Sequence, residues 1–265
     1  MDTQMWGPLV WDLLAVAGRA VDDMPADPAS AADGPRRRAT RAFVLLAYSL
    51  RHVLPCSFCR TSYRHYIEDT PPAEFVDGSD EAARVRALGV AVDAAAPRHH
   101  TLVDWVWLVH DRVNRKLGVR NMLTRPRFRK RLRVTAALVH PSAVWDLLTI
   151  VALNYPVEGM DTLNAASAVS ADGAQCDPEQ RAKRTGHAVF LDALSRLLPL
   201  VPDLGSVAPY VDPRRALLAG ALVARAPFVS WVRAEKRAWM RGVGADPALC
   251  ARMIAAERAY MASVA

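Results

Sequence analysis

The sequence predicts an all-α protein. Apolar side chains recur every three or four residues along most of the chain, which is the spacing of one buried helix face. The breaks between these stretches carry proline or glycine, which end helices. No segment shows the regular alternation of apolar and polar residues that is typical of a half-buried β-strand.

Two helices are predicted before the first cysteine. The first covers residues 6–21, where Leu9 and Leu13 belong to one apolar face. The second covers about residues 37–53. The dipeptide Leu54-Pro55 ends it, because the residue before a proline disfavours the helical conformation.

The third predicted helix, roughly residues 56–69, has a C-x-x-C pair in its first turn. A short helical stretch is predicted near residues 80–95. The strongest remaining pattern covers about residues 101–117, and Gly118 follows it in the position where glycine commonly terminates a helix. The N-terminal half is therefore predicted to be helical along most of its length.

Composition limits the class of protein. A chain of 265 residues can form one or two domains, and 52% hydrophobic with 23% charged residues is typical of a soluble globular protein. The N-terminus has no basic segment of a signal peptide, and the apolar runs are too short to span a membrane. We therefore expect no signal peptide, no membrane span and a cytoplasmic location.

The net charge of +7 raises the question of nucleic-acid binding. The main basic runs are residues 36–38 and 125–133. Arginine greatly outnumbers lysine and accompanies abundant alanine, a bias that we attribute to the base composition of the gene. We therefore interpret these runs as solvated helix faces and predict no nucleic-acid partner.

The pair Cys56 and Cys59 allows three interpretations: a redox dithiol, half of a zinc site, or a chance pairing. Four cysteines are too few for a secreted disulfide scaffold. A zinc site needs further ligands, and no histidine shows a zinc spacing among the candidates His52, His65, His99 and His100, so we predict no metal. A thiol in a first helical turn is expected to have a lowered pKa, which suits disulfide exchange.

A second polar group lies on the helix predicted over residues 101–117. His110 and Asp111 precede Asn114 by four and three residues, so these residues share one side of that helix. Taken alone, this segment is a surface helix with a buried tryptophan. Together with the cysteine pair it permits a more specific interpretation.

Three motifs in this order resemble the Erv/ALR group of FAD-linked sulfhydryl oxidases. They are WGPLVW at 6–11, LPCSFC at 54–59 and WVWLVHDRVNRKLG at 105–118. Two-domain members from large DNA viruses are the most similar form. The resemblance implies a small bundle of four or five helices that holds FAD and passes electrons from dithiol proteins to dioxygen, giving hydrogen peroxide. It also implies the host cytoplasm or the virion as location if the protein is viral.

The resemblance implies that Cys59 lies beside the flavin and that Cys56 meets the incoming dithiol. The residues implied to bind the cofactor are Gly7, Trp11, His110, Asp111, Val113, Asn114 and Lys116. Two departures concern the site: Ala15 stands where the family has histidine, and Asp111 stands where it has asparagine. The family's structural disulfide is absent, since no cysteine lies between residues 60 and 175, as in some viral members.

The predicted domains are an oxidase domain over residues 1–124 and a helical C-terminal domain over residues 125–265. Three segments of the second half echo the first in the same order: 143–156 echoes 9–25, 188–199 echoes 42–55, and 226–244 echoes 100–118. Lys236 and Met240 take the places of His110 and Asn114. We predict a degenerate, flavin-less copy; the alternative is chance similarity between apolar helices.

The first helix has a further apolar face that needs cover, formed by Leu9, Leu13, Val16 and Ala20. We expect a homodimer, with an intramolecular pseudo-dimer as the alternative.

Cys176 lies in a polar loop that suits a shuttle, whereas Cys250 is expected to be a small buried hydrophobe. A non-catalytic helical interaction protein, in which the Cys56–Cys59 pair is structural, is the alternative function.

Overall fold

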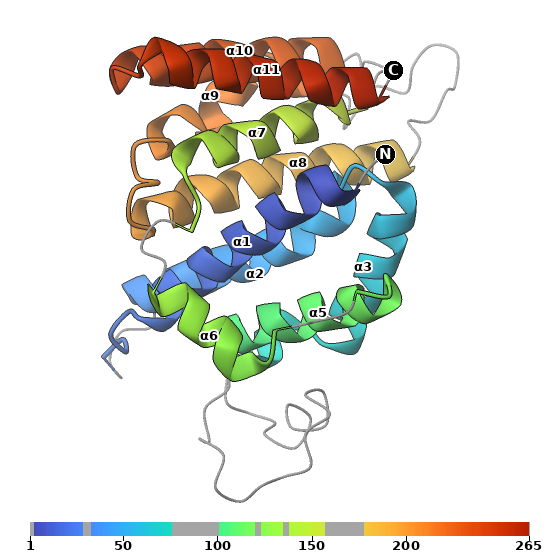
Figure 1. The fold of residues 1–265 in the computed structure, drawn as a ribbon, viewed down its shortest axis with the longest axis vertical. Helices are drawn as coiled ribbons and strands as arrows, with labels where there is room; N and C mark the ends of the chain where they lie inside the picture. The colour runs from blue at the N-terminus through green and yellow to red at the C-terminus, as the bar shows by residue number, and fades with distance from the viewer. Residues whose placement is uncertain are drawn as a thin grey trace, which may run out of the picture.

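The protein is described by a computed structural model over residues 3–28, 33–75, 101–119, 123–134, 138–156 and 178–264. These residues form helices and turns without any β-strand, which confirms the predicted all-α class (Figure 1). The helix predicted near residues 80–95 lies outside them. Within the described ranges, no helix combines the length and apolarity that crossing a membrane requires.

In the described part of the first half of the chain, six helical segments are present. They are α1 (Thr3–Asp22), α2 (Pro35–Val53), α3 (Ser57–Asp69), the 3₁₀ segment η1 (Pro72–Phe75), α5 (Leu102–Lys116) and α6 (Arg125–Val134). Local sequence sets their ends. The α2 helix has proline in its first turn and stops at Leu54, before Pro55. The α5 helix starts with a capping box between Thr101 and Asp104.

The second half is also helical. Its α-helices are α7 (Pro141–Leu153), α8 (Pro178–Leu197), α9 (Pro213–Leu218), α10 (Arg225–Gly242) and α11 (Pro247–Val264). Short 3₁₀ segments, η2 (Leu198–Leu200), η3 (Ala208–Tyr210) and η4 (Ala221–Val223), lie between α8 and α10. Proline is the first residue of four of these five α-helices. Proline is tolerated there because an N–H at the first helical position would make no hydrogen bond within the helix.

The C-terminal ends of α5 and α10 have the same geometry. Gly118 and Gly244 both adopt a left-handed conformation, with φ of 68° and 61°. The backbone N–H of the residue after each glycine donates a hydrogen bond to the carbonyl five residues earlier. Val119 donates to the Asn114 carbonyl at 3.0 Å, and Ala245 donates to the Met240 carbonyl at 2.9 Å. This equivalence agrees with the alignment of residues 226–244 on 100–118.

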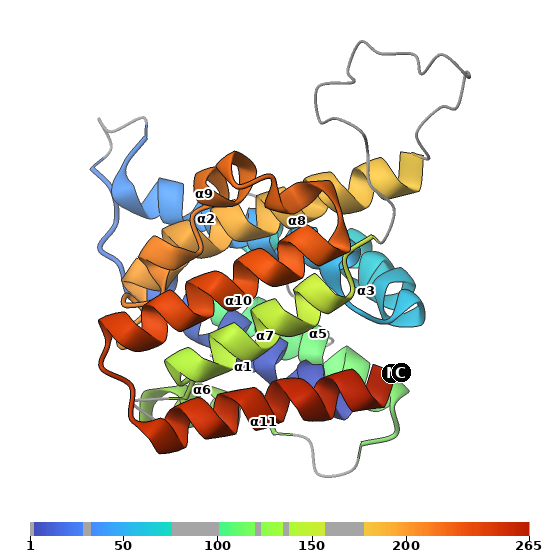
Figure 2. The ribbon, with the colours of Figure 1, turned by 90° about the horizontal axis from the view of Figure 1, so that it is seen from above.

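The helices of the two halves also pack in corresponding pairs. Within the first half α1 packs on α5, and within the second half the corresponding helices α7 and α10 pack on each other. Between the halves, α1 packs on α7 and α2 packs extensively on α8 (Figures 1 and 2). In a two-fold symmetric dimer, elements near the axis contact their own counterparts in the other subunit. In this protein the two counterparts belong to one chain. Its second half therefore covers the apolar faces of α1 and α2.

One continuous hydrophobic core joins these layers. It includes Trp105 of α5 and Trp145 of α7, both fully buried. The α6 helix adds Phe128 and Leu132 and packs on α1 and α5, although it follows the predicted boundary at residue 124. It therefore packs with the helices of the first half.

Candidate functional site

The α1 and α5 helices run antiparallel. At the end of α1, the Asp22 carboxylate accepts hydrogen bonds from the backbone N–H groups of Leu102 and Val103, at 3.1 and 3.0 Å. Nearer the start of α1, the Trp11 ring lies against the His110 ring. The middle of α1 therefore lies beside the middle of α5.

The α3 helix also runs antiparallel to α5. Trp105 Nε1 donates to the Thr70 carbonyl just after α3, at 2.9 Å. Lys116 Nζ, at the other end of α5, donates to Ser62 Oγ at 2.6 Å. The beginning of α3 therefore lies beside the end of α5, and the cysteine pair lies at that end of the bundle. We call it the dithiol end, defined by Trp11, Cys56, Cys59, His110 and Lys116.

The cysteine pair begins α3, as the sequence predicts. Cys56 is the N-cap, and its Sγ accepts a hydrogen bond from the Cys59 backbone N–H at 3.2 Å. Both cysteines are half-buried and carry free thiols. Arg60 Nη1 donates to the Leu54 carbonyl at 2.7 Å and to the Pro55 carbonyl at 3.3 Å, which fixes the turn that leads into the pair.

The Cys59 thiol does not have the lowered pKa that its helical position suggested. Burial, together with the hydrogen bond and charge of Cys56, raises the pKa of Cys59 to about 12 against the opposing charge of Arg60. The helix-start N–H points at Cys56 Sγ instead of Cys59 Sγ. The expected lowering of the pKa is therefore wrong for Cys59, which keeps its proton at neutral pH in the reduced pair.

Trp11 and His110 form a stacked pair at the dithiol end. Their ring centroids are 4.8 Å apart and their planes differ by 15°. Burial lowers the pKa of His110 to about 4, helped by the positive charge of Arg131 and opposed by Asp111. His110 is therefore neutral at neutral pH, so that one ring nitrogen can donate a hydrogen bond and the other can accept one.

The other residues predicted to bind the cofactor lie on the same part of α5. The Asp111 carboxylate accepts a hydrogen bond from Arg115 Nε at 2.8 Å, so Arg115 balances the extra negative charge. Val113 and Asn114 are half-buried, whereas Lys116 is exposed. The Lys116 ammonium lies 4.2 Å from the centroid of the Phe58 ring.

The first turn of α1 has features that suit a bound polar group. Gly7 is buried, yet a Cβ placed on it would meet no atom within 4 Å. The neighbouring Trp6 Nε1 is buried and has no hydrogen-bond partner in the described part of the chain. Because buried donors are usually satisfied, the unpaired Trp6 N–H fits a hydrogen-bond acceptor that FAD could supply. These two features are compatible with the implied cofactor site.

The basic run at 125–133 has a structural role that the sequence did not reveal. Asp104 is completely buried, and its carboxylate accepts hydrogen bonds from Arg125 at 2.8 Å and from Arg129. Burial alone would raise the pKa of Asp104, but the two guanidinium groups outweigh it and lower the pKa. Two arginines of the run therefore anchor α6 to α5 and are not part of a solvated face.

In the second half, side chains fill the positions that correspond to the dithiol end. Lys236, which matches His110, is buried with Nζ 3.8 Å from Asp146 and 3.9 Å from Glu257. Trp145, which matches Trp11, is completely buried beside Trp239, with ring centroids 6.1 Å apart. The face used by Trp11 and His110 in the first half is therefore occupied by protein here.

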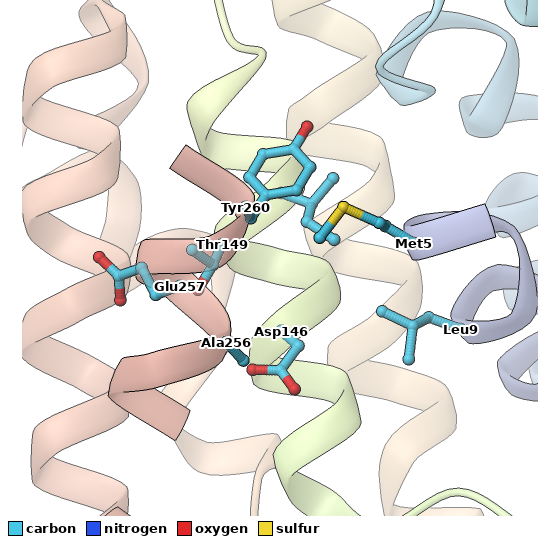
Figure 3. Close-up of a pocket in the computed structure, with 8 residues that line it drawn as sticks. Met5, Leu9, Asp146, Thr149, Ala256, Glu257 and Tyr260 are labelled. Atoms are coloured by element: carbon cyan, nitrogen blue, oxygen red, sulfur yellow. The ribbon is translucent and has the colours of Figure 1, made fainter. Parts of the chain in front are cut away.

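A small pocket of about 170 Å³ lies beside this cluster, between α1, α7 and α11 (Figure 3). Its lining residues are Met5, Leu9, Asp146, Thr149, Ile150, Ala256, Glu257 and Tyr260. Pockets for drug-sized ligands are usually roughly 300–1,000 Å³. This pocket is therefore too small for a flavin dinucleotide.

The remaining candidate residues do not form a second site in the described structure. Cys250 is half-buried in α11, so it is not the fully buried residue that we expected. Cys176, His99 and His100 lie outside the described residues. Among the residues described, no group of three or more histidine, cysteine, aspartate or glutamate side chains is arranged to hold a metal ion.

No protein-family model, no curated protein and no solved structure matches this chain.

Proposed function

We propose that the protein is an FAD-dependent thiol oxidase that forms disulfides in protein substrates. The observation that carries the proposal is that the Cys56–Cys59 pair begins the helix whose Ser62 contacts Lys116 of α5, while His110, six residues before Lys116 on the same helix, stacks on Trp11 of α1. These residues come from three helices, and the fold brings together the three motifs of the resemblance. A structural cysteine pair alone would not need this neighbourhood.

The cysteine pair performs thiol–disulfide exchange. A substrate thiolate attacks Cys56 Sγ of the Cys56–Cys59 disulfide, and the S–S bond breaks with its electron pair left on Cys59. The second substrate thiol loses its proton and attacks the substrate sulfur of the mixed disulfide. This attack releases Cys56 as a thiolate. The substrate leaves as a disulfide, and the reduced pair holds two electrons.

The reduced pair needs an acceptor for these two electrons. FAD, when bound, would take them up and pass them to dioxygen, which becomes hydrogen peroxide. On this chain Gly7, Trp11 and His110 would contact the cofactor, and Asn114 and Lys116 would hold its adenine and phosphate portion. Cys59, with its raised pKa, must give up its proton when the pair is oxidised again.

The second half serves, in this proposal, as a permanent partner that replaces a second subunit. Its α7 and α8 helices cover α1 and α2, which favours the intramolecular pseudo-dimer over a homodimer through the same faces. Lys236 and Trp145 occupy the corresponding face, which supports a second copy without flavin. A homodimer would need a different surface.

The absorbance spectrum of the purified protein tests the cofactor. We expect the full chain, produced with sufficient FAD, to show visible flavin absorbance after gel filtration. Cys59→Ala should keep the flavin, because its side chain donates electrons and is not required for binding. A well-folded wild-type chain that remains colourless after incubation with FAD would contradict the proposal.

A further inference from the structure

The face of α3 that carries Cys56 is basic. Cys56, Arg60 and Arg64 are spaced by four residues, so they follow one another along one side of the helix. The Arg60 N–H donates to the Cys56 carbonyl at 2.9 Å, which shows that the helical register extends to the cysteine. Arg60 is fixed by the backbone carbonyls before Cys56, and Arg64 is exposed.

The other side of the cysteine pair carries a cation and an aromatic ring. Phe58 precedes Cys59 directly and is 64% exposed, which is unusual for a phenylalanine. The Lys116 ammonium lies 4.2 Å from the centroid of its ring. Apolar surface and positive charge therefore occur together next to the redox cysteines.

Arg51 of α2 and Lys116 of α5 add further positive charge, and the row of Cys56, Arg60 and Arg64 on α3 continues to an exposed carboxylate only at Glu68, one turn beyond Arg64. Within the described residues, no carboxylate oxygen lies within 4.0 Å of a nitrogen of Arg51, Arg60, Arg64 or Lys116. Burial and the charges of Arg51, Arg64 and Arg60 together lower the pKa of His52 to about 4. The surface around Cys56 therefore has a positive potential.

We propose that the surface formed by Phe58, Arg60 and Arg64 selects polypeptide substrates whose cysteines are flanked by acidic residues. The proposal rests on the proposed function in one respect, that Cys56 is the cysteine which meets the substrate. An acidic segment would pair with the arginines along α3 while its cysteine reaches Cys56. An apolar neighbour of that cysteine would contact Phe58.

Electrostatics explains why such a surface would discriminate between substrates. Charges of one sign around a reactive group can raise the rate of association of an oppositely charged partner by about 10–1,000-fold at low salt. A basic polypeptide is repelled by the same charges. Neither effect acts on an uncharged small dithiol, so dithiothreitol serves as a neutral reference.

Exchange at Cys56 tests the proposal without using flavin or oxygen. The full chain carrying Cys59→Ala is mixed with three peptides that differ only in glutamate, glutamine or lysine residues beside a single cysteine. That cysteine is held as a disulfide with an aromatic thiol. The Cys56 thiolate attacks the peptide sulfur and releases the aromatic thiolate, whose absorbance gives the rate. Peptide mapping separates the Cys56 adduct from adducts of the other cysteines.

We expect the glutamate peptide to react about tenfold faster or more than the lysine peptide at low ionic strength. The ratio should approach one near 1 M salt, where the screening length is about 3 Å. Arg64→Glu should lower the ratio at least about threefold. Arg252→Glu, which changes the net charge equally at an exposed position of α11, should leave the ratio unchanged.

Three results would overturn the proposal: equal rates for the acidic and basic peptides, equal effects of Arg64→Glu and Arg252→Glu, or no adduct at Cys56. Dithiothreitol-dependent oxygen consumption by the unmodified chain is measured separately. A chain that discriminates between the peptides but consumes no oxygen contradicts only the oxidase function. A chain that oxidises dithiothreitol without discriminating between the peptides contradicts only the selection of acidic substrates.

Discussion

The close crossing of α2 and α8 allows a direct test of the internal pairing of the two halves. At Gly186 in α8, an added Cβ would lie 2.8 Å from His52 Cγ in α2 and closer still to His52 Cβ. Ordinary contacts of a Cβ begin at about 3.4 Å. Gly186→Ala therefore requires the two helices to move apart, because His52 Cβ is bonded to the backbone and cannot rotate away.

Two effects determine the size of the change. Overpacking at such a contact costs about 1–3 kcal/mol. Replacing glycine by alanine within a helix returns up to about 1 kcal/mol through helix propensity. We therefore expect Gly186→Ala to lower the free energy of unfolding by about 1–2 kcal/mol.

Urea unfolding of the full chain, followed by circular dichroism, gives this quantity from the midpoint and the slope. Gly205→Ala is the matched control, because its added Cβ has Pro199 Cα as its nearest neighbour, at 3.9 Å. It should change stability by no more than about 0.5 kcal/mol. Equal effects of the two substitutions, or stabilisation by Gly186→Ala, would refute the close packing of α2 on α8.

Further predictions concern the anchor of α6, the response to acid and the cofactor. Asp104→Asn leaves Arg125 and Arg129 without their carboxylate and should destabilise the fold by about 3–5 kcal/mol in urea unfolding. Asp192→Asn, which breaks an exposed pair with Arg196, should cost less than about 1 kcal/mol. Similar losses of stability in the two variants would show that the Asp104 cluster is not a buried anchor. Burial lowers the pKa of His187 from its ordinary value of 6.5 to about 4, so between these pH values the unfolded chain binds a proton that the folded chain does not. Stability should therefore fall by up to roughly 3 kcal/mol as the pH drops through this window, and His187→Gln should flatten the profile of unfolding free energy against pH; an unchanged profile would argue against this assignment. His110→Ala and Asn114→Ala should each weaken FAD binding by about 1–3 kcal/mol in a flavin titration, while Met240→Ala, the matched change in the second half, should have no effect. Equal losses of FAD affinity would mean that the flavin site is wrongly assigned to the first half.

Local sequence signals were sufficient to predict most of the individual helices. The periodic apolar residues, Pro55 and Gly118 place the ends of α2 and α5 within two residues of those observed. The same signals place Cys56 and Cys59 in the first turn of α3. These features depend on residues that are close in the chain, and such residues can be interpreted from the sequence alone.

Features that depend on distant contacts were not predicted. An arginine run does not show which side chains meet a buried carboxylate, so the pairing of Arg125 and Arg129 with Asp104 needed the structure. The pKa of Cys59 depends on its burial, which the position in the helix does not determine. The four-residue spacing of Cys56, Arg60 and Arg64 would have been sufficient to predict the basic face of α3 from the sequence.

The central claim is that Cys59 passes electrons from a thiol to a bound flavin and on to dioxygen. Oxygen consumption by the full chain loaded with FAD, with dithiothreitol as the dithiol, tests this claim most directly. We predict steady consumption of oxygen with formation of hydrogen peroxide, and its loss in Cys59→Ala although the flavin stays bound. Undiminished oxygen consumption by Cys59→Ala, or none by the flavin-loaded wild-type chain, would contradict the claim.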